Sequence, residues 1–417
     1  MSVIFFVILF FGFYIDFKIW RRISPCTVSF LGVYFILIIH LLIAEPLGFV
    51  DIDDQLYLYL LIFYLIGFIA SVLAAVIFWE GKRGRQSIPL SPASFEFSRR
   101  AEKVILLLSI ILCGFASYNI YTAYISVGSF VSDDFENMLT YGVAGHIFAL
   151  LMAMLPFVMD VYIRERKKIF GIIIVLIFIL LFMKQVKYWV MIPLVWMPWY
   201  LICGGFIKLS LKKYITLSMM VIGLLLLLFF SVYFMKVYFS SADSSALDYG
   251  AVINDIAIHF FGYLFSGILA FSTYIKMGFY NSLVVHDGLG LFSGILNIFN
   301  VTTGSELISL NLYRPMIELN TLSGSIGNVP SLWGTILLAS GYFSFILFFF
   351  IIFLLSILSG LSRNSKCLLI VYTFLTSFMF FSWFDYYYYL LTPYEVSVFC
   401  IILYLFLKAI SKRKCSS

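Results

Sequence analysis

Apolar runs long enough to cross a membrane recur along almost the whole of this chain. Of its 417 residues, 63% are hydrophobic and only 12% are charged, and the mean hydropathy is +1.05. A helix needs about 20 apolar residues to cross the hydrocarbon core of a bilayer. The pattern therefore predicts an all-α, polytopic membrane helix bundle and excludes a soluble globule. We expect about eleven transmembrane helices, at residues 2–17, 26–44, 56–79, 104–125, 143–161, 169–183, 188–207, 214–235, 334–358, 367–384 and 388–407.

The loops between these runs alternate in charge. Loops such as 82–103 and 164–168 carry clusters of Lys and Arg, whereas 45–54 and 133–136 carry acids. Loops rich in Lys and Arg stay in the cytoplasm. The alternation therefore predicts an amino terminus outside and a carboxyl terminus in the cytoplasm. It also accounts for the net charge of +6 without a nucleic-acid partner.

We predict a single integral membrane domain over residues 1–417, with one long outer loop at 236–333 between the eighth and ninth spans. This loop contains two apolar stretches, Ile256–Ile275 and Leu289–Val301. If only one of them crossed the membrane, the charge alternation of the later loops would break. Both are therefore expected either to lie outside as short surface helices or to dip in together as a hairpin. Polar and glycine residues interrupt the first stretch, which favours a helix lying in the membrane interface.

Five cations lie on the outer side, where the charge rule disfavours them: Lys184, Lys187, Lys236, Lys276 and Arg314. Such a placement suggests an anion to be held there. Lys184 and Lys187 are three residues apart and share a helix face. The apolar run before them covers, at about 1.5 Å a residue, roughly 22 Å of a core about 30 Å thick. The two lysines are therefore expected either to meet a lipid-borne diphosphate in a recess or to extend to the headgroups.

Arg314 is the single outer arginine, in the segment Asn311–Pro315. Its planar guanidinium suits bidentate binding of phosphate or carboxylate. The competing hypothesis is an ion pair with Glu306 or Glu318 in the same loop. Both hypotheses stay open here, and phosphate is favoured because no other guanidinium lies outside.

Histidines supply the candidate bases. His286 stands beside Asp287, and a carboxylate next to a histidine can orient the ring as it removes a proton from an attacking hydroxyl. His259 is the second candidate. The alternatives are a solvated turn for His286 and Asp287 and an interfacial histidine for His259. His40 and His146 fall within spans, where bonds to neighbouring helices are expected.

Aromatic residues cluster at the outer end of the tenth span, in Asp385–Tyr389. Tyrosines at this depth usually belong to the aromatic belt of a membrane protein. Exposed rings also stack on sugars, so Tyr386 and Tyr387 are candidate glycan contacts. Glu395, one turn into the last span, is an intramembrane carboxylate and for that reason a functional candidate.

The number of spans, the outer cations between two middle spans and the large outer loop late in the chain resemble the O-antigen polymerases, also called oligosaccharide repeat-unit polymerases. Tyr263–Phe271 looks like the segment that opens this loop in the family. Asn328–Gly334, followed by Ala339–Phe343, resembles the pattern that closes it, and Asn328 is a further candidate glycan contact. The resemblance implies a bacterial inner-membrane glycosyltransferase. Such an enzyme joins glycan repeat units carried on undecaprenyl pyrophosphate at the periplasmic face.

The resemblance also implies roles for residues and partners. Lys184 or Lys187 stands where related enzymes have an outer arginine thought to hold the pyrophosphate, and Arg314 matches the arginine of the outer loop. No metal, nucleotide sugar or other cofactor is expected. The expected partners are the undecaprenyl-pyrophosphate-linked glycan, membrane lipid and a protein that regulates chain length. The alternative functions are a lipid-linked glycan flippase or transporter and an O-antigen ligase.

Overall fold

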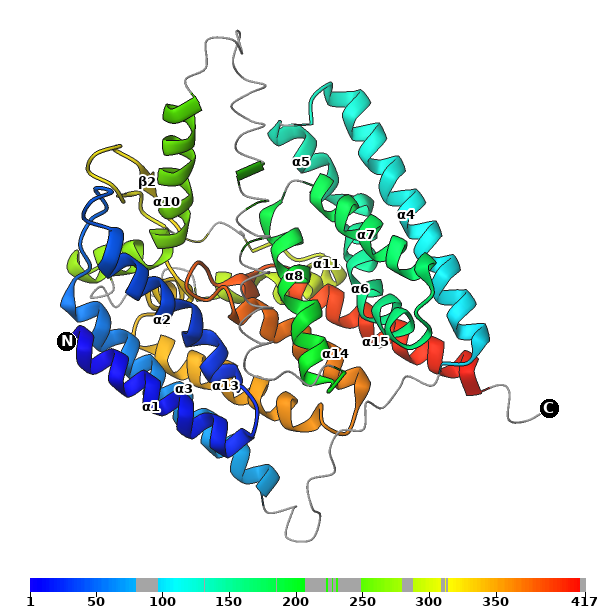
Figure 1. Cartoon of the computed structure of the whole chain (residues 1–417), viewed down its shortest axis with the longest axis horizontal. Helices are drawn as coiled ribbons and strands as arrows, with labels where there is room; N and C mark the ends of the chain where they lie inside the picture. Colours follow the sequence, from blue (N-terminus) through cyan, green and yellow to red (C-terminus); the bar gives the residue numbers. More distant parts are fainter. Residues whose placement is uncertain are drawn as a thin grey trace. The chain divides into compact units, whose positions relative to one another are not determined.

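The computed structural model describes residues 1–79, 97–130, 132–184, 186–206, 223, 227, 230–231, 249–279, 288–308, 312 and 314–412 (Figure 1). Eight helices of this part are long and apolar enough to cross a membrane. Three shorter apolar helices, Lys168–Met183, Tyr188–Cys203 and Lys366–Met379, lie on predicted spans as well. The predicted all-α polytopic helix bundle is confirmed. The predicted span 214–235 lies largely outside the described residues.

The helices group into two compact units. The single integral membrane domain over residues 1–417 stays a prediction. The first unit comprises Met1–Gln86, Leu226–Gly360 and Phe378–Leu391. The second comprises Ser87–Leu225, Leu361–Ser377 and Thr392–Ser417. Each unit is thus assembled from segments that lie far apart in the sequence.

The first unit contains the helices near the amino terminus together with segments of the predicted outer loop. Its helices are α1 (Ser2–Trp20), α2 (Pro25–Ile43), α3 (Asp54–Trp79), α10 (Tyr249–Lys276), α11 (Ser293–Thr303), α12 (Leu332–Ser340) and α13 (Phe343–Leu361). It also holds the 3-10 turns η3 (Gly290–Phe292) and η4 (Tyr387–Tyr389), and an antiparallel pair of strands, β1 (Ile317–Glu318) and β2 (Ile326–Gly327). Helices α1, α2 and α3 pack against one another (Figure 1).

Polar side chains fix the turn between α1 and α2. Ser24 caps the start of α2, and Pro25 occupies the first helical position, where its missing N–H is no loss. The buried carboxylate of Asp16 accepts hydrogen bonds from the hydroxyls of Ser24, Thr27 and Ser71. This buried acid is therefore satisfied within the unit and has a structural role.

The second unit is built around one central helix. Its helices are α4 (Arg99–Val127), α5 (Asp133–Thr140), α6 (Gly142–Glu165), α7 (Lys168–Met183), α8 (Lys187–Cys203), the greater part of α14 (Lys366–Met379) and α15 (Thr392–Lys412). Helix α6 contacts α4, α5, α7, α8 and α15, and its residues from Leu151 to Val158 are all buried. Because α6 packs against five other helices, it brings side chains of several helices together.

The predicted span 334–358 is wrong as a single helix. The chain forms α12 and α13 instead, with a break at Gly341 and Tyr342. Gly341 has φ 55° and ψ −138°, a backbone conformation that is largely restricted to glycine. Its N–H still donates to the carbonyl of Leu337, which closes the last turn of α12. Hydropathy reports how apolar a run is and gives no information on such a change of φ.

Helix α10 packs closely on the rest of the first unit. Its carboxyl-terminal half is buried, and it contacts α2, α3 and α12. Gly267 permits this approach, because a Cβ there would lie 2.2 Å from the carbonyl oxygen of Trp383. Helix α10 is also one of the eight helices long and apolar enough to span a membrane. Its placement as an outer surface helix stays a prediction, and α11 supplies the second short helix expected in the loop.

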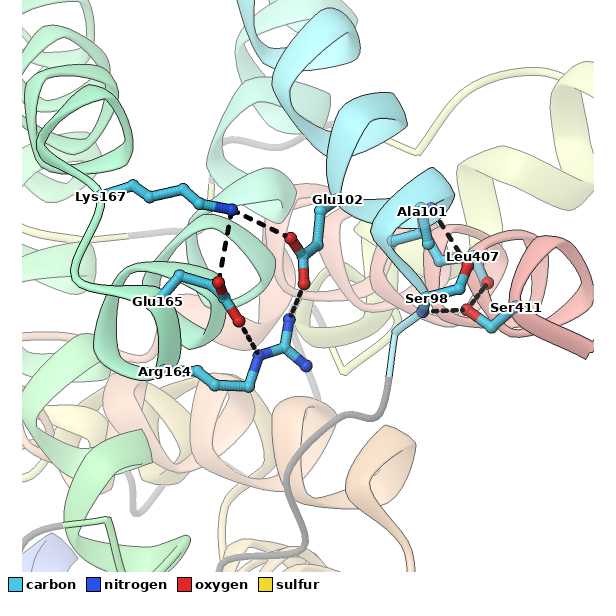
Figure 2. A network of polar contacts seen from close by, with 8 residues as sticks. All are labelled: Ser98, Ala101, Glu102, Arg164, Glu165, Lys167, Leu407 and Ser411. Atoms are coloured by element: carbon cyan, nitrogen blue, oxygen red, sulfur yellow. Dashed lines mark hydrogen bonds and ion pairs between the residues drawn. The ribbon is translucent and has the colours of Figure 1, made fainter.

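An ion-pair network joins the start of α4 to the end of α6 (Figure 2). Arg164 donates to Glu102 at 2.6 Å, and Lys167 Nζ lies 3.5 Å from Glu102 and 3.3 Å from Glu165. Beside it, the backbone N–H of Ser98 donates to the Ser411 hydroxyl at 3.1 Å. Two of the cations in the loop 164–168 are thus neutralised within the second unit.

Candidate functional site

A fully buried lysine lies at the end of α7 in the second unit. Lys184 has 0% exposure, and its Nζ makes no hydrogen bond to any described residue. The Nζ lies 3.5 Å from the centre of the Trp189 ring and 5.4 Å from that of Phe148. A desolvated cation–π contact contributes about 2 kcal/mol, which is less than the several kcal/mol that removing an ammonium from water costs. The residue is therefore suited to receive an anion.

The surroundings of Lys184 act on its pKa in opposite directions. Burial lowers the pKa of Lys184 to about 7, and the carboxylates of Glu395 and Glu136 oppose that shift. Near neutral pH, the side chain thus exists in both protonation states. An anion at Nζ would favour the charged form.

A histidine–glutamate pair joins α6 to α15 in the same unit. His146, near the start of α6, contacts the carboxylate of Glu395, in the first turn of α15, through its Nδ1 atom. The predicted bond of His146 to a neighbouring helix is confirmed. The His146 side chain is 59% exposed and that of Glu395 only 14%. A carboxylate at one ring nitrogen fixes the orientation of the imidazole and leaves the other nitrogen for chemistry.

Tyr188 and Thr392 extend this arrangement. The Tyr188 hydroxyl lies 3.2 Å from the Thr392 hydroxyl, at the start of α15 and one turn before Glu395. We call the five residues Lys184, His146, Tyr188, Thr392 and Glu395 the lysine–histidine cluster. It combines a cation, a hydroxyl donor and an oriented imidazole.

Arg314, in the first unit, forms a two-point ion pair with Asp385. Its Nη1 lies 3.1 Å from Oδ2 and its Nη2 lies 2.8 Å from Oδ1. The two side chains are only 13% and 6% exposed. The ion-pair hypothesis was thus right about the kind of partner, but the acid is Asp385 and not Glu306 or Glu318. Although burial acts against the charge, Asp385 raises the pKa of Arg314 above its usual value, so the guanidinium stays ionised.

Further contacts anchor this ion pair. The Thr335 hydroxyl and the Tyr386 backbone N–H both donate to Asp385 Oδ1, at 3.3 and 2.6 Å. Next to Arg314, the Tyr274 hydroxyl donates to the carbonyl of Pro315 at 2.6 Å. These contacts link the segment around Arg314 to α10, to α12 and to the segment after α14. The geometry fits a residue that positions the loop.

The structure describes only some of the other predicted site residues. His286, Asp287 and the side chain of Lys187 lie outside the described residues. His259 is exposed on α10 in the first unit. Asn328 is half-buried in the segment before α12.

The two candidate glycan tyrosines differ in exposure. Tyr386 is only 1% exposed, and its ring packs against that of Tyr388. A sugar therefore has no access to its face. Tyr387 is half-buried, with its ring 6.1 Å from Phe378, which makes it the better candidate of the two.

The residues that pair in the fold lie far apart in the sequence, and the sequence did not predict that they meet. His146 and Glu395 are 249 residues apart, so only the packing of α6 on α15 pairs them. Asp160, a carboxylate of α6 with 2% exposure, was not singled out at all. His146, Glu395 and Asp160 are all ionisable residues inside predicted spans. Ionisable residues inside spans are functional candidates by default, so this property could have identified all three.

The apolar helices and the buried ionisable residues define a multi-pass membrane protein of the all-α class. The chain belongs to a family of unknown function, DUF6337, whose model matches residues 48–414. Neither the curated proteins nor the solved structures gave a match.

Proposed function

We propose that this protein is a glycosyltransferase that polymerises undecaprenyl-pyrophosphate-linked oligosaccharide repeat units at the periplasmic face of the bacterial inner membrane. The observation that carries the proposal is Lys184, a buried ammonium without a hydrogen-bond acceptor among the described residues. In the topology expected from the charged loops, Lys184 lies at the outer end of a span. A diphosphate attached to a membrane lipid presents its charge at that depth. The resemblance to O-antigen polymerases supports the same assignment.

The proposed reaction exchanges one bond to the anomeric carbon for another. A hydroxyl of the acceptor glycan attacks the anomeric carbon of the donor, and the bond from that carbon to the phosphate oxygen breaks. The electron pair of this bond leaves with undecaprenyl pyrophosphate. Lys184 stabilises the negative charge that develops on the phosphate, and the low dielectric around the lysine strengthens the effect. Because Lys184 is fully buried beside Trp189, the diphosphate reaches Nζ only when that ring moves aside.

We propose that His146 is the base that accepts the proton of the attacking hydroxyl. Its ring is exposed, Glu395 orients it, and both belong to the unit that contains Lys184. The charge of Glu395 also acts on Lys184, which places the candidate base within electrostatic range of the candidate anion site. His286, Asp287 and His259, favoured by the sequence, remain candidates with less support.

Lys187 and Arg314 enter the proposal as secondary contacts. Lys184 follows the end of α7 and Lys187 begins α8, so the predicted shared helix face is wrong. We propose that Lys187, three residues after Lys184, adds a second charge near the same diphosphate. The charge of Arg314 is already balanced by Asp385. We therefore propose that Arg314 positions the outer loop and contributes to pyrophosphate binding only through that loop.

A deletion strain that carries plasmid-borne variants tests the function. The wild-type gene should restore a ladder of surface glycan. Lys184→Met and His146→Gln should leave a single repeat unit, although the protein reaches the membrane in normal amounts. Lys103→Met, which removes an exposed lysine from α4, is the matched control and should keep the ladder.

The same strain separates the competing functions. Polymer that accumulates without transfer to its final acceptor indicates a ligase, and repeat units held in the inner leaflet indicate a flippase. A normal ladder with Lys184→Met at wild-type protein level would refute the proposed site.

A further inference from the structure

A groove with charge at one end and an apolar wall lies between α6 and α7. Its volume is about 450 Å³, and six residues line it: Tyr162, Arg166, Lys168, Gly171, Ile172 and Val175. All of them belong to the second unit. The groove lies at the carboxyl end of α6, whereas His146 of the lysine–histidine cluster is near its amino end.

Local backbone geometry produces this groove. Arg166 follows α6 in the left-handed region, with φ 53°, and its N–H donates to the carbonyl of Tyr162. The chain therefore reverses within two residues, and α7 begins at Lys168. Gly171 lets the Tyr162 ring lie against α7, because a Cβ there would come within 3.0 Å of that ring.

The two cations of the groove are available to an external anion. The acids around this loop, Glu102 and Glu165, pair with Arg164 and Lys167 (Figure 2). Among the described residues, no ion pair forms with Arg166 or Lys168, and both side chains are exposed. Two neighbouring positive charges thus remain at one end of the groove.

The opposite wall of the groove is apolar and faces outward from the unit. Ile172 is 62% exposed and Val175 is 59% exposed, one turn apart on α7. On a short helix made almost entirely of apolar residues, such exposed side chains meet lipid chains rather than water. A ligand of this groove therefore carries an anionic group and a hydrocarbon chain together.

We propose that this groove binds an anionic phospholipid, with its phosphate between Arg166 and Lys168 and one acyl chain along Ile172 and Val175. The expected topology places the loop 164–168 in the cytoplasm. The cytoplasmic leaflet carries the anionic lipids, and basic pockets between spanning helices on that side bind their headgroups. The site is independent of the proposed glycosyl transfer.

Native mass spectrometry of the full chain, released from nanodiscs that contain equal parts of phosphatidylglycerol and phosphatidylcholine, tests the site. The wild type should retain phosphatidylglycerol preferentially. The double variant Arg166→Asn, Lys168→Gln should lower that retention about tenfold. Asparagine suits the left-handed position, so the turn is kept while the charge is removed. Val175→Trp should lower retention as well, because it fills the apolar part and leaves both cations in place.

The matched control is the double variant Arg99→Gln, Arg100→Gln, which removes two exposed cations from the start of α4. It should retain phosphatidylglycerol as the wild type does, and all variants are compared at equal folded fraction by thermal melting. An equal loss in this control would overturn the proposal, because the attraction would then be general to the basic face. Competition by inorganic phosphate, together with normal retention in Val175→Trp, would overturn it too and would indicate a phosphate site. Glycan elongation measured in parallel reports on the proposed function separately.

Discussion

The buried charge of Lys184 lowers the stability of the folded protein, which a residue with a purely structural role would not do. Replacing this buried, unpaired ammonium with methionine of similar length removes the cost of desolvation and keeps the packing against Trp189. We expect Lys184→Met to raise the free energy of unfolding by about 1 kcal/mol or more, while glycan elongation is lost. Thermal denaturation in detergent measures the first effect, with Lys184→Arg as the charged control. A less stable Lys184→Met protein that still elongates glycan would contradict both parts.

Anion binding at Lys184 should depend on pH in a defined direction. The pKa of Lys184 is about 7, so the ammonium form prevails below pH 7 and declines above it. We expect the Kd for a prenyl diphosphate sugar, whose phosphates stay ionised over this range, to rise roughly tenfold for each pH unit above 7. The carboxylates of Glu395 and Glu136 are the acidic groups whose charges act on Lys184. Calorimetry at pH 6 to 9 measures the trend.

The control for that trend is Lys184→Arg. Arginine does not titrate in this range, so its Kd should stay constant from pH 6 to 9. A wild-type profile as flat as that of the arginine variant would show that Lys184 does not carry the dependence.

The Arg314–Asp385 pair should behave as a buried unit. Arg314→Met leaves the Asp385 carboxylate buried and uncompensated, and we expect a loss of about 3–5 kcal/mol in the free energy of unfolding. The double variant Arg314→Met, Asp385→Leu should recover most of this loss, because neither charge remains. Melting curves of the two variants and the wild type measure the loss and its recovery. If the double variant is less stable than the single one, the pair is not the source of the effect.

Helix α10 packs so closely on the segment Trp383–Phe384 that only glycine fits at position 267. A Cβ at Gly267 would lie 2.2 Å from the carbonyl oxygen of Trp383 and 2.7 Å from that of Phe384. Because these are backbone atoms, Gly267→Ala must displace α10, and we expect it to destabilise the protein by about 1–3 kcal/mol. Resistance to proteolysis and thermal melting report this displacement.

Gly262 provides the comparison on the same helix. The nearest atom to a Cβ there is Phe49 Cε1 at 4.0 Å, an ordinary contact. Gly262→Ala should be neutral or slightly stabilising, since alanine has the higher helix propensity. Equal effects of the two substitutions would mean that α10 does not pack as described.

At the scale of the whole molecule, the open question of topology is α10. The charge alternation requires α10 and α11 either to stay outside together or to enter together as a hairpin, and the length and apolarity of α10 also suit a span. If α10 lies outside as a surface helix, reporter fusions after Ser244 and Ser282 should both be active in the periplasm. A fusion after Ser365, between α13 and α14, should be active only in the cytoplasm. Opposite locations of the Ser244 and Ser282 fusions would show that α10 crosses the membrane.

The sequence alone determined the class of fold. A bilayer admits only apolar segments whose backbone groups bond internally, so composition and run length suffice to predict membrane helices. Most predicted spans agree with observed helices to within about five residues, and the agreement is best for 56–79 with α3 and 169–183 with α7. The span 334–358 failed because the break at Gly341 depends on φ, which hydropathy does not encode.

The tertiary structure decided which side chains meet. Lys184 was singled out as a cation on the side of the membrane that the charge rule disfavours. Its burial against Trp189 follows from how α7 and α8 pack. His146 meets Glu395 across 249 residues, and Arg314 meets Asp385 across 71. Helix periodicity relates residues that are three or four positions apart. These pairs depend instead on which helices become neighbours. In a chain of uniformly apolar helices, the shapes of the side chains determine that choice, and no pattern along the sequence reveals it.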